Sequence, residues 1–110
     1  IRELFYQLEG KVTDWEGFNL DYHKNNIRLK NNKKIKIWIG VQQKCLHIDL
    51  LSRVDFKGNV KSVKKKFILD DPKKLFTLRK NNYREIYSFK LRNDKNIDYV
   101  VLMMKQKFDS

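Results

Sequence analysis

The chain of 110 residues is 41% hydrophobic and 35% charged, which argues against a disordered segment and leaves room for one small domain with a single core. Lys and Arg number 25 against 13 Asp and Glu, so the formal net charge is +12. Residues 1–22 carry a net charge of −3, and residues 23–110 therefore carry +15. A field of this sign attracts polyanions, namely nucleic acid, an anionic membrane or an acidic protein. An abundance of Lys and Asn that merely follows an AT-rich gene would give the same charge.

Cysteine usage and hydropathy restrict the class of protein further. The one cysteine, Cys45, excludes a disulfide within the chain and fits a reducing compartment, so we expect a cytoplasmic protein. No apolar run approaches the roughly 20 residues that span a bilayer, and no signal-peptide pattern is visible, so we expect no membrane partner. Because the sequence begins at Ile1, inside a helical pattern, we expect residues 1–110 to be a single domain taken from a longer protein.

Apolar residues recur at helical spacing near the N-terminus, at Ile1, Leu4, Phe5, Leu8 and Val12. Positions i, i+3, i+4, i+7 and i+11 lie on one face of a helix, so the pattern predicts an amphipathic helix that ends near Gly10. Residues 13–26 mix turn formers with aromatic residues. They predict a loop, in part, whose aromatic side chains cover the core from outside.

The stretch 34–41 (KIKIWIGV) has the clearest strand pattern in the chain. A period of two with β-branched residues on one face is typical of a half-buried strand. The residues expected on the core face are Ile35, Ile37, Ile39 and Val41. The residues expected to share the outward face are Lys34, Lys36 and Trp38. Residues 27–29 and a turn at residues 31–32 predict a hairpin partner in front of this strand.

Further strands follow. Alternation over residues 45–50, which continues raggedly to Val54 and Phe56, predicts a strand before a turn at residues 57–59. Residues 60–69 indicate another strand, which Pro72 and the two aspartates before it end. Pro72 also suits the first turn of a short helix, with Asp71 as its cap.

The C-terminal third closes the domain. After a basic loop at residues 79–84, residues 87–91 indicate a last strand, and residues 95–108 predict a helix capped by Asn93 or Asp94. The side chains expected to face the sheet are Ile97, Val101 and Met104. The whole pattern predicts an α+β fold, with a four- to five-stranded, mostly antiparallel sheet and an N-terminal and a C-terminal helix packed on one face. The other face would stay open to solvent or to a partner.

Most of the chain resembles a known family. The runs DDPKKL (70–75), YSFKL (87–91) and DYVVLMM (98–104) follow the closing pattern of that family, and residues 27–41 resemble its central strands. The family is a small uncharacterised prokaryotic domain described as a "predicted transport protein", which also occurs at the C-terminus of proteins related to restriction and nuclease systems. Its members tend to have a glycine-rich, tryptophan-containing loop before the last strand, whereas this chain has RKNNY at residues 79–83. The resemblance implies a companion domain in a bacterial, archaeal or phage protein, without a known active site of its own.

One set of potential metal ligands lies on a predicted strand. Cys45, His47 and Asp49 would project from the same face, but a structural zinc site needs four converging ligands. His23 is the one further soft ligand in the chain, and nothing in the sequence places it nearby. We therefore expect no metal and no cofactor.

A second set would fit a nuclease. In Asp55-Phe56-Lys57, the carboxylate and the lysine are spaced as in metal-dependent nucleases that hold Mg²⁺ and stabilise the phosphate. Such a site needs another acidic residue from an earlier strand, for which Asp21 and Asp49 are the candidates. A Mg²⁺-dependent nuclease is therefore a remote alternative. No Ser-His-Asp arrangement or phosphate loop is apparent, so we expect no catalytic residues and no enzymatic activity of the isolated domain.

The basic residues give the best functional clue. A nucleic-acid surface needs cations that neutralise phosphates, interleaved with aromatic rings that stack on bases. The candidate nucleic-acid-binding residues are Lys34, Lys36, Trp38, Lys64, Lys65, Lys66, Arg79, Lys80, Tyr83 and Arg84. They predict a non-catalytic accessory domain that binds DNA or RNA within a larger protein, one related to restriction or nuclease systems if the resemblance holds.

Two alternatives remain open for Trp38. Its ring would be buried if residues 13–22 covered it, and the lysines would then be an ordinary solvated face. Alternatively, the chain would be a protein-interaction or regulatory domain, in which Trp38 anchors a protein partner or the remainder of the parent chain.

Overall fold

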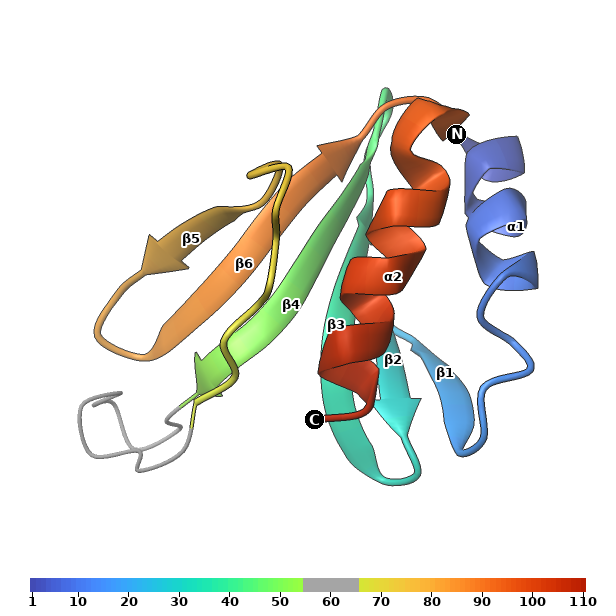
Figure 1. The fold of residues 1–110 in the computed structure, drawn as a ribbon. Coiled ribbons are helices and arrows are strands. Elements are labelled where there is room, and N and C mark those ends of the chain that lie inside the picture. The colour runs from blue at the N-terminus through green and yellow to red at the C-terminus, as the bar shows by residue number, and fades with distance from the viewer. Residues whose placement is uncertain (55–65) are drawn as a thin grey trace.

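The computed structural model describes residues 1–54 and 66–110, which form a six-stranded sheet and two α-helices (Figure 1). In chain order the elements are α1 (Arg2–Gly10), β1 (Phe18–Tyr22), β2 (Ile27–Asn31), β3 (Lys34–Val41), β4 (Leu46–Val54), β5 (Thr77–Lys80), β6 (Arg84–Leu91) and α2 (Ile97–Phe108). A short 3₁₀ helix, Asp94–Asn96, leads into α2. The predicted α+β class is confirmed, although six strands exceed the four to five that we expected.

All neighbouring strands are antiparallel, in the order β1-β2-β3-β4-β6-β5. Strands β1 to β4 follow one another as consecutive neighbours. The next strand in the chain, β5, lies at the edge of the sheet, and β6 lies between β5 and β4. The sheet therefore has β1 and β5 as its two edges.

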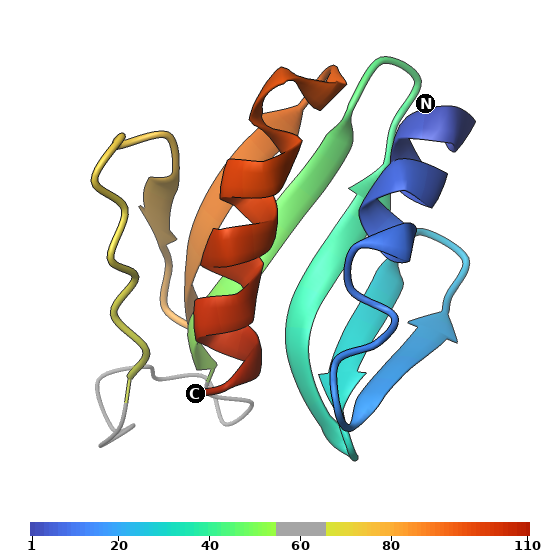
Figure 2. The ribbon, with the colours of Figure 1, turned by 45° about the vertical axis from the view of Figure 1, so that its right-hand side comes forward.

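Both helices lie on one face of the sheet, and residues 66–76 run beside α2 on the side of β5 (Figure 2). The core is the layer between the helices and the sheet. Its most deeply buried side chains, each less than 2% exposed, are Leu8, Val12, Leu29, Ile37, Ile39, Leu46, Ile48, Leu50, Leu91, Val100, Met104 and Phe108. As predicted, neither described helix covers the opposite face of the sheet.

Helix α2 buries a wide apolar stripe against the sheet, with Val100 fully buried and Met103 5% exposed. The prediction that Val101 faces the sheet is wrong, because Val101 is half-buried at the side of the helix. Its neighbour Val100 faces the sheet instead. Five consecutive apolar residues, 100–104, leave the sequence pattern without a preferred face. Asn93 caps the 3₁₀ helix that leads into α2, since its side chain accepts a hydrogen bond from the backbone N–H of Lys95, whereas α2 itself begins after Asn96 without a side-chain cap.

The N-terminal helix is confirmed, and Leu4, Phe5 and Leu8 bury its apolar face. The segment expected to be a loop is partly wrong, because residues 18–22 form β1 against β2. Trp15 covers the core as expected, with its ring 5.0 Å from that of Phe108. Aromatic residues therefore close this end of the core from the helix side.

The region after β4 differs most from the predicted one. Residues 55–65, with most of the expected strand at 60–69, lie outside the described residues, and residues 66–69 are not a strand. Residues 72–73 form a turn in place of a short helix, in which the carboxylate of Asp71 accepts hydrogen bonds from the backbone N–H of Phe76 and from the hydroxyl of Tyr99. The expected basic loop at 79–84 is instead the tip of the β5–β6 hairpin.

Candidate functional site

The sheet surface opposite the helices, which we call the open face, carries every second side chain of the strands. The register places Arg28 beside Trp38, Trp38 beside Asp49, and Asp49 beside Ser88 across four adjacent strands. The open face includes Arg28, Lys30, Trp38, His47, Asp49, Leu51, Arg79, Arg84, Ile86, Ser88 and Lys90. This surface is basic, with an aromatic ring near its centre.

Trp38 lies on the open face because its neighbours Ile37 and Ile39 point into the core, where they are at most 2% exposed. The guanidinium of Arg84 from β6 lies over its ring, 5.0 Å from the centroid, which is a cation–π contact. Residues 13–22 do not cover it, since Trp15 packs on Phe108 at the helix side. The alternative in which those residues bury Trp38 is therefore excluded.

The prediction that Lys34 and Lys36 share the face of Trp38 is wrong. The register between β2 and β3 shifts after Leu29, so that Lys36 is an extra, bulged residue and Ile35, opposite Lys30, moves to the open face. The ammonium of Lys36 instead donates a hydrogen bond to the carbonyl oxygen of Ser110, 2.6 Å away at the end of α2. Lys34 is paired with Asn31, whose side-chain amide donates to the carbonyl oxygen of Phe108.

The tip of the β5–β6 hairpin brings two of the predicted arginines onto the open face. The side-chain oxygen of Asn81 accepts from the backbone N–H groups of Tyr83 and Arg84, which fixes the turn. Arg79 and Arg84 line a small hollow of about 140 Å³ together with Asp49. Lys80, which lies opposite the buried Glu85 in the strand register, also borders this hollow, and Tyr83 at the tip is 59% exposed. Of the three predicted lysines at 64–66, Lys66 is exposed and the other two lie outside the described residues.

A carboxylate sits within this basic surface. Asp49 Oδ1 accepts a hydrogen bond of 2.6 Å from Ser88 Oγ and lies 3.2 Å from His47 Nε2. In hydrolase triads the imidazole stands between the serine and the carboxylate, whereas here the carboxylate stands in the middle. The arrangement therefore fixes Asp49 and offers no base that activates Ser88.

The potential zinc ligands do not converge. Cys45 is buried and its thiol donates to the side-chain oxygen of Gln42, away from His47 and Asp49. Within residues 1–54 and 66–110, no three His, Cys, Asp or Glu side chains are grouped so that they could hold a metal ion.

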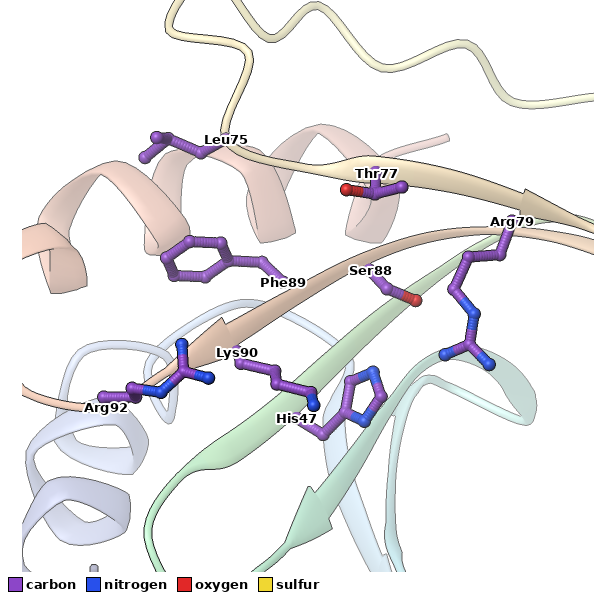
Figure 3. A pocket seen from close by; sticks show the side chains of 8 residues that line it. All are labelled: His47, Leu75, Thr77, Arg79, Ser88, Phe89, Lys90 and Arg92. Atoms are coloured by element: carbon purple, nitrogen blue, oxygen red, sulfur yellow. The ribbon is translucent and has the colours of Figure 1, made fainter.

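Sequence reasoning missed a cationic hollow beside the β5 edge, of about 380 Å³. Figure 3 shows the charged ends of Arg79, Lys90 and Arg92 turned toward the ring of His47, with Ser88 at the floor. Strand β5 pairs with β6 only as far as Ser88. The residues of β6 after Ser88 therefore have no β5 residue beside them, and they border this hollow. The alternation of Lys90 and Arg92 in the last strand was the signal in the sequence, but without β5 the hollow could not be foreseen.

The nuclease alternative finds no support in the described residues. Asp55 and Lys57 lie outside them. The two candidate partners of Asp55 lie on different strands, Asp21 on β1 and Asp49 on β4, and each is already engaged by a neighbouring side chain. The ammonium of Lys30, which hydrogen-bonds Asp21 at 2.8 Å, lowers the pKa of that carboxyl.

None of the helices in the described part of the chain has the length and apolar character needed to cross a bilayer. Comparisons with family models, with curated proteins and with solved structures found no match for this chain, so the resemblance noted in the sequence stays a prediction.

Proposed function

We propose that this domain is a non-catalytic, basic accessory domain that binds nucleic acid through the open face, as part of a larger protein. The observation that carries the proposal is the contact between Trp38 and Arg84 at the centre of a cationic sheet surface. Bases stack on aromatic rings and on guanidinium planes, and phosphates bind the surrounding cations.

The charges of the open face support this reading. Among the described residues, Arg28, Arg79, Arg84 and Lys90 form no ion pair with a carboxylate. Asp21 is neutralised by Lys30, and Asp49 is hydrogen-bonded to Ser88. Four cations therefore remain available for phosphates on the open face.

The central apolar side chains of this face are not an exposed patch. Leu51 and Ile86 are 7% and 8% exposed, and Ile86 borders a hollow with Arg79 and Arg84. A protein interface centred on Trp38 would be expected to present a larger apolar area. The open face is better suited to a polyanion than to an apolar partner.

The test is a binding titration against salt. Fluorescence anisotropy with labelled single- and double-stranded DNA and RNA should show affinity that falls with salt, with a log–log slope of roughly −0.7 to −0.9 for each phosphate contact. The double variant Arg79→Glu/Arg84→Glu should weaken binding to all sequences alike, because phosphate contacts carry no sequence information.

The matched control is Arg2→Glu/Lys95→Glu. It changes the net charge equally, but both residues are exposed at the start of helical segments on the covered face, where Glu is well tolerated. If both variants weakened binding equally, binding would depend on the net charge of the domain and not on the open face. If the wild-type domain bound no polynucleotide at low salt, the proposal would fail and the protein-interaction alternative would stand.

A further inference from the structure

The sheet divides into two halves at one place. The ladder between β3 and β4 ends at Ile37 and Leu50, while β3 continues along β2 and β4 continues along β6. Bulges lie beside this point, at Lys36 in β3 and at Ser52 in β4, and a bulge bends its strand and increases the twist. Figure 1 shows the strands diverging there, with the last turn of α2 in front of the opening. We call this opening the fork.

A pocket of about 380 Å³ occupies the fork. Trp38, Leu51 and Ile35 form an apolar wall, and three lysines, Lys33, Lys34 and Lys107, supply positive charge. Its volume lies at the lower end of the range for pockets that hold one small ligand. A second hollow, of about 450 Å³, adjoins it through Lys33 and Lys34 and includes Lys36.

The lysines of the fork lack anionic partners among the described residues. Lys107 is half-buried on α2, and its ammonium lies 5.1 Å from the ring centroid of Phe67. Within residues 1–54 and 66–110 it has neither a hydrogen-bond acceptor nor a carboxylate as partner. Burial, followed by the charge of Lys36, lowers the pKa of Lys107 to about 8. Asp109, which follows the last residue of α2, forms an ion pair with Lys105, with Nζ and Oδ1 3.2 Å apart. A bound anion would relieve this repulsion and replace the lost hydration of Lys107.

The two halves of the pocket define the chemistry of the ligand. A wall with an indole and a leucine suits a flat, largely apolar ring, and clustered ammonium groups suit a phosphate. A nucleoside phosphate combines both parts. In duplex DNA or RNA the base is stacked and paired, so only an unpaired nucleotide can enter a pocket of this kind.

We propose that the fork pocket receives one unpaired nucleotide of a strand lying on the open face, with the base against Trp38 and Leu51 and the phosphate among Lys33, Lys34 and Lys107. The inference rests on the proposed function, because the open face supplies the remaining contacts to the strand. It adds that the domain selects single strands over duplexes.

The test compares Lys107→Gln with Lys105→Gln, its matched control on the same helix, using a single-stranded octanucleotide and a duplex of equal length. Lys107→Gln should lower affinity for the single strand about tenfold or more and reduce its salt slope by about 0.7, which is one phosphate contact. Duplex affinity should stay unchanged. Lys107→Arg, which keeps the charge, should restore most of the loss, and Lys105→Gln should behave like the wild type.

Two further readouts locate the ligand. In a Trp15→Phe background the fluorescence reports Trp38 alone, and the single strand should quench it more than the duplex does. At pH 8, titration calorimetry of the single strand in buffers of different ionisation enthalpy should show proton uptake, which Lys107→Gln abolishes.

The outcomes separate this inference from the proposed function. Equal affinity for single strands and duplexes, or equal loss of both in Lys107→Gln, would overturn the fork site and leave the open face in place. If thymidine monophosphate bound well while strands did not bind, the pocket would be a free-nucleotide site, and both proposals would fail. If inorganic phosphate bound as tightly as thymidine monophosphate, Trp38 would have no part in the site and the inference would fail.

Discussion

Trp38 joins two chemically different environments. On the open face its ring is in contact with the guanidinium of Arg84, and at the fork it lines the pocket with Lys107. Its ring nitrogen is buried and has no hydrogen-bond partner among the described residues. Such a donor costs free energy in the folded state, so the position is poorly explained by stability alone. We take it as the residue on which the proposed binding depends most.

Trp38→Ala should therefore weaken single-strand binding by about 1–3 kcal/mol, the usual contribution of a base stacked on an aromatic ring. Trp15→Ala is the control, because its ring packs against Phe108 in the core and its loss should lower the melting temperature more than the affinity. Anisotropy titrations and thermal unfolding of both variants provide the measurement. Undiminished binding by a well-folded Trp38→Ala protein would contradict the stacking role.

Lys107 allows a prediction about pH. Its pKa is about 8 in the folded protein against 10.5 as the ordinary value, so between these pH values the unfolded chain binds more protons than the folded one. The free energy of unfolding contributed by this residue should therefore rise as pH increases from about 8 to about 10. Over this interval the difference in melting temperature between the wild type and Lys107→Gln should shift in favour of the wild type. Parallel curves for the two proteins would show that the ammonium is well solvated.

At the scale of elements, the clearest patterns were predictable and the edges of the sheet were not. Helix α1 and the buried positions Ile37 and Ile39 followed directly from period and composition. Strand β5 was missed because all four of its residues are exposed, so no hydrophobic alternation marks it. The bulge at Lys36 was missed because alternation in the sequence continues through it, while the pairing with β2 does not.

Helix α2 provides a test of the core. Val100→Asp places an unpaired charge at a fully buried position and should cost about 3–5 kcal/mol, a large part of the stability of a small domain. Leu102→Asp on the same helix is 63% exposed and should change stability by no more than about 0.5 kcal/mol. Urea unfolding followed by circular dichroism gives both values. Similar midpoints for the two variants would show that the helix is not packed as described.

At the scale of the whole molecule, charge and fold act together. The helices occupy one face of the sheet, and the cations of the described strands lie partly on the open face and partly around the fork. The sequence predicted the charge and the open face. It could not place individual lysines, because their positions depend on bulges and on strand order.

We also predict that residues 1–110 alone do not cleave nucleic acid. Both candidate partners of Asp55 are already engaged, Asp21 by Lys30 and Asp49 by Ser88 and His47. Incubation with single- and double-stranded DNA and RNA in Mg²⁺ or Mn²⁺ should leave every substrate intact on a denaturing gel. Cleavage that Asp55→Asn or Lys57→Ala abolishes would reverse this prediction and establish the nuclease alternative.

The edge strand β5 has a consequence for solubility. An edge strand exposes unpaired backbone groups that can template the addition of a strand from another chain, and short, positively charged edges suppress this self-association. Strand β5 has four residues and carries Arg79 and Lys80. By this rule the cations at this edge should oppose strand pairing between copies of the domain. A bound polyanion neutralises them, so neighbouring copies on one long strand would lose their mutual repulsion and crowd together, edge beside edge.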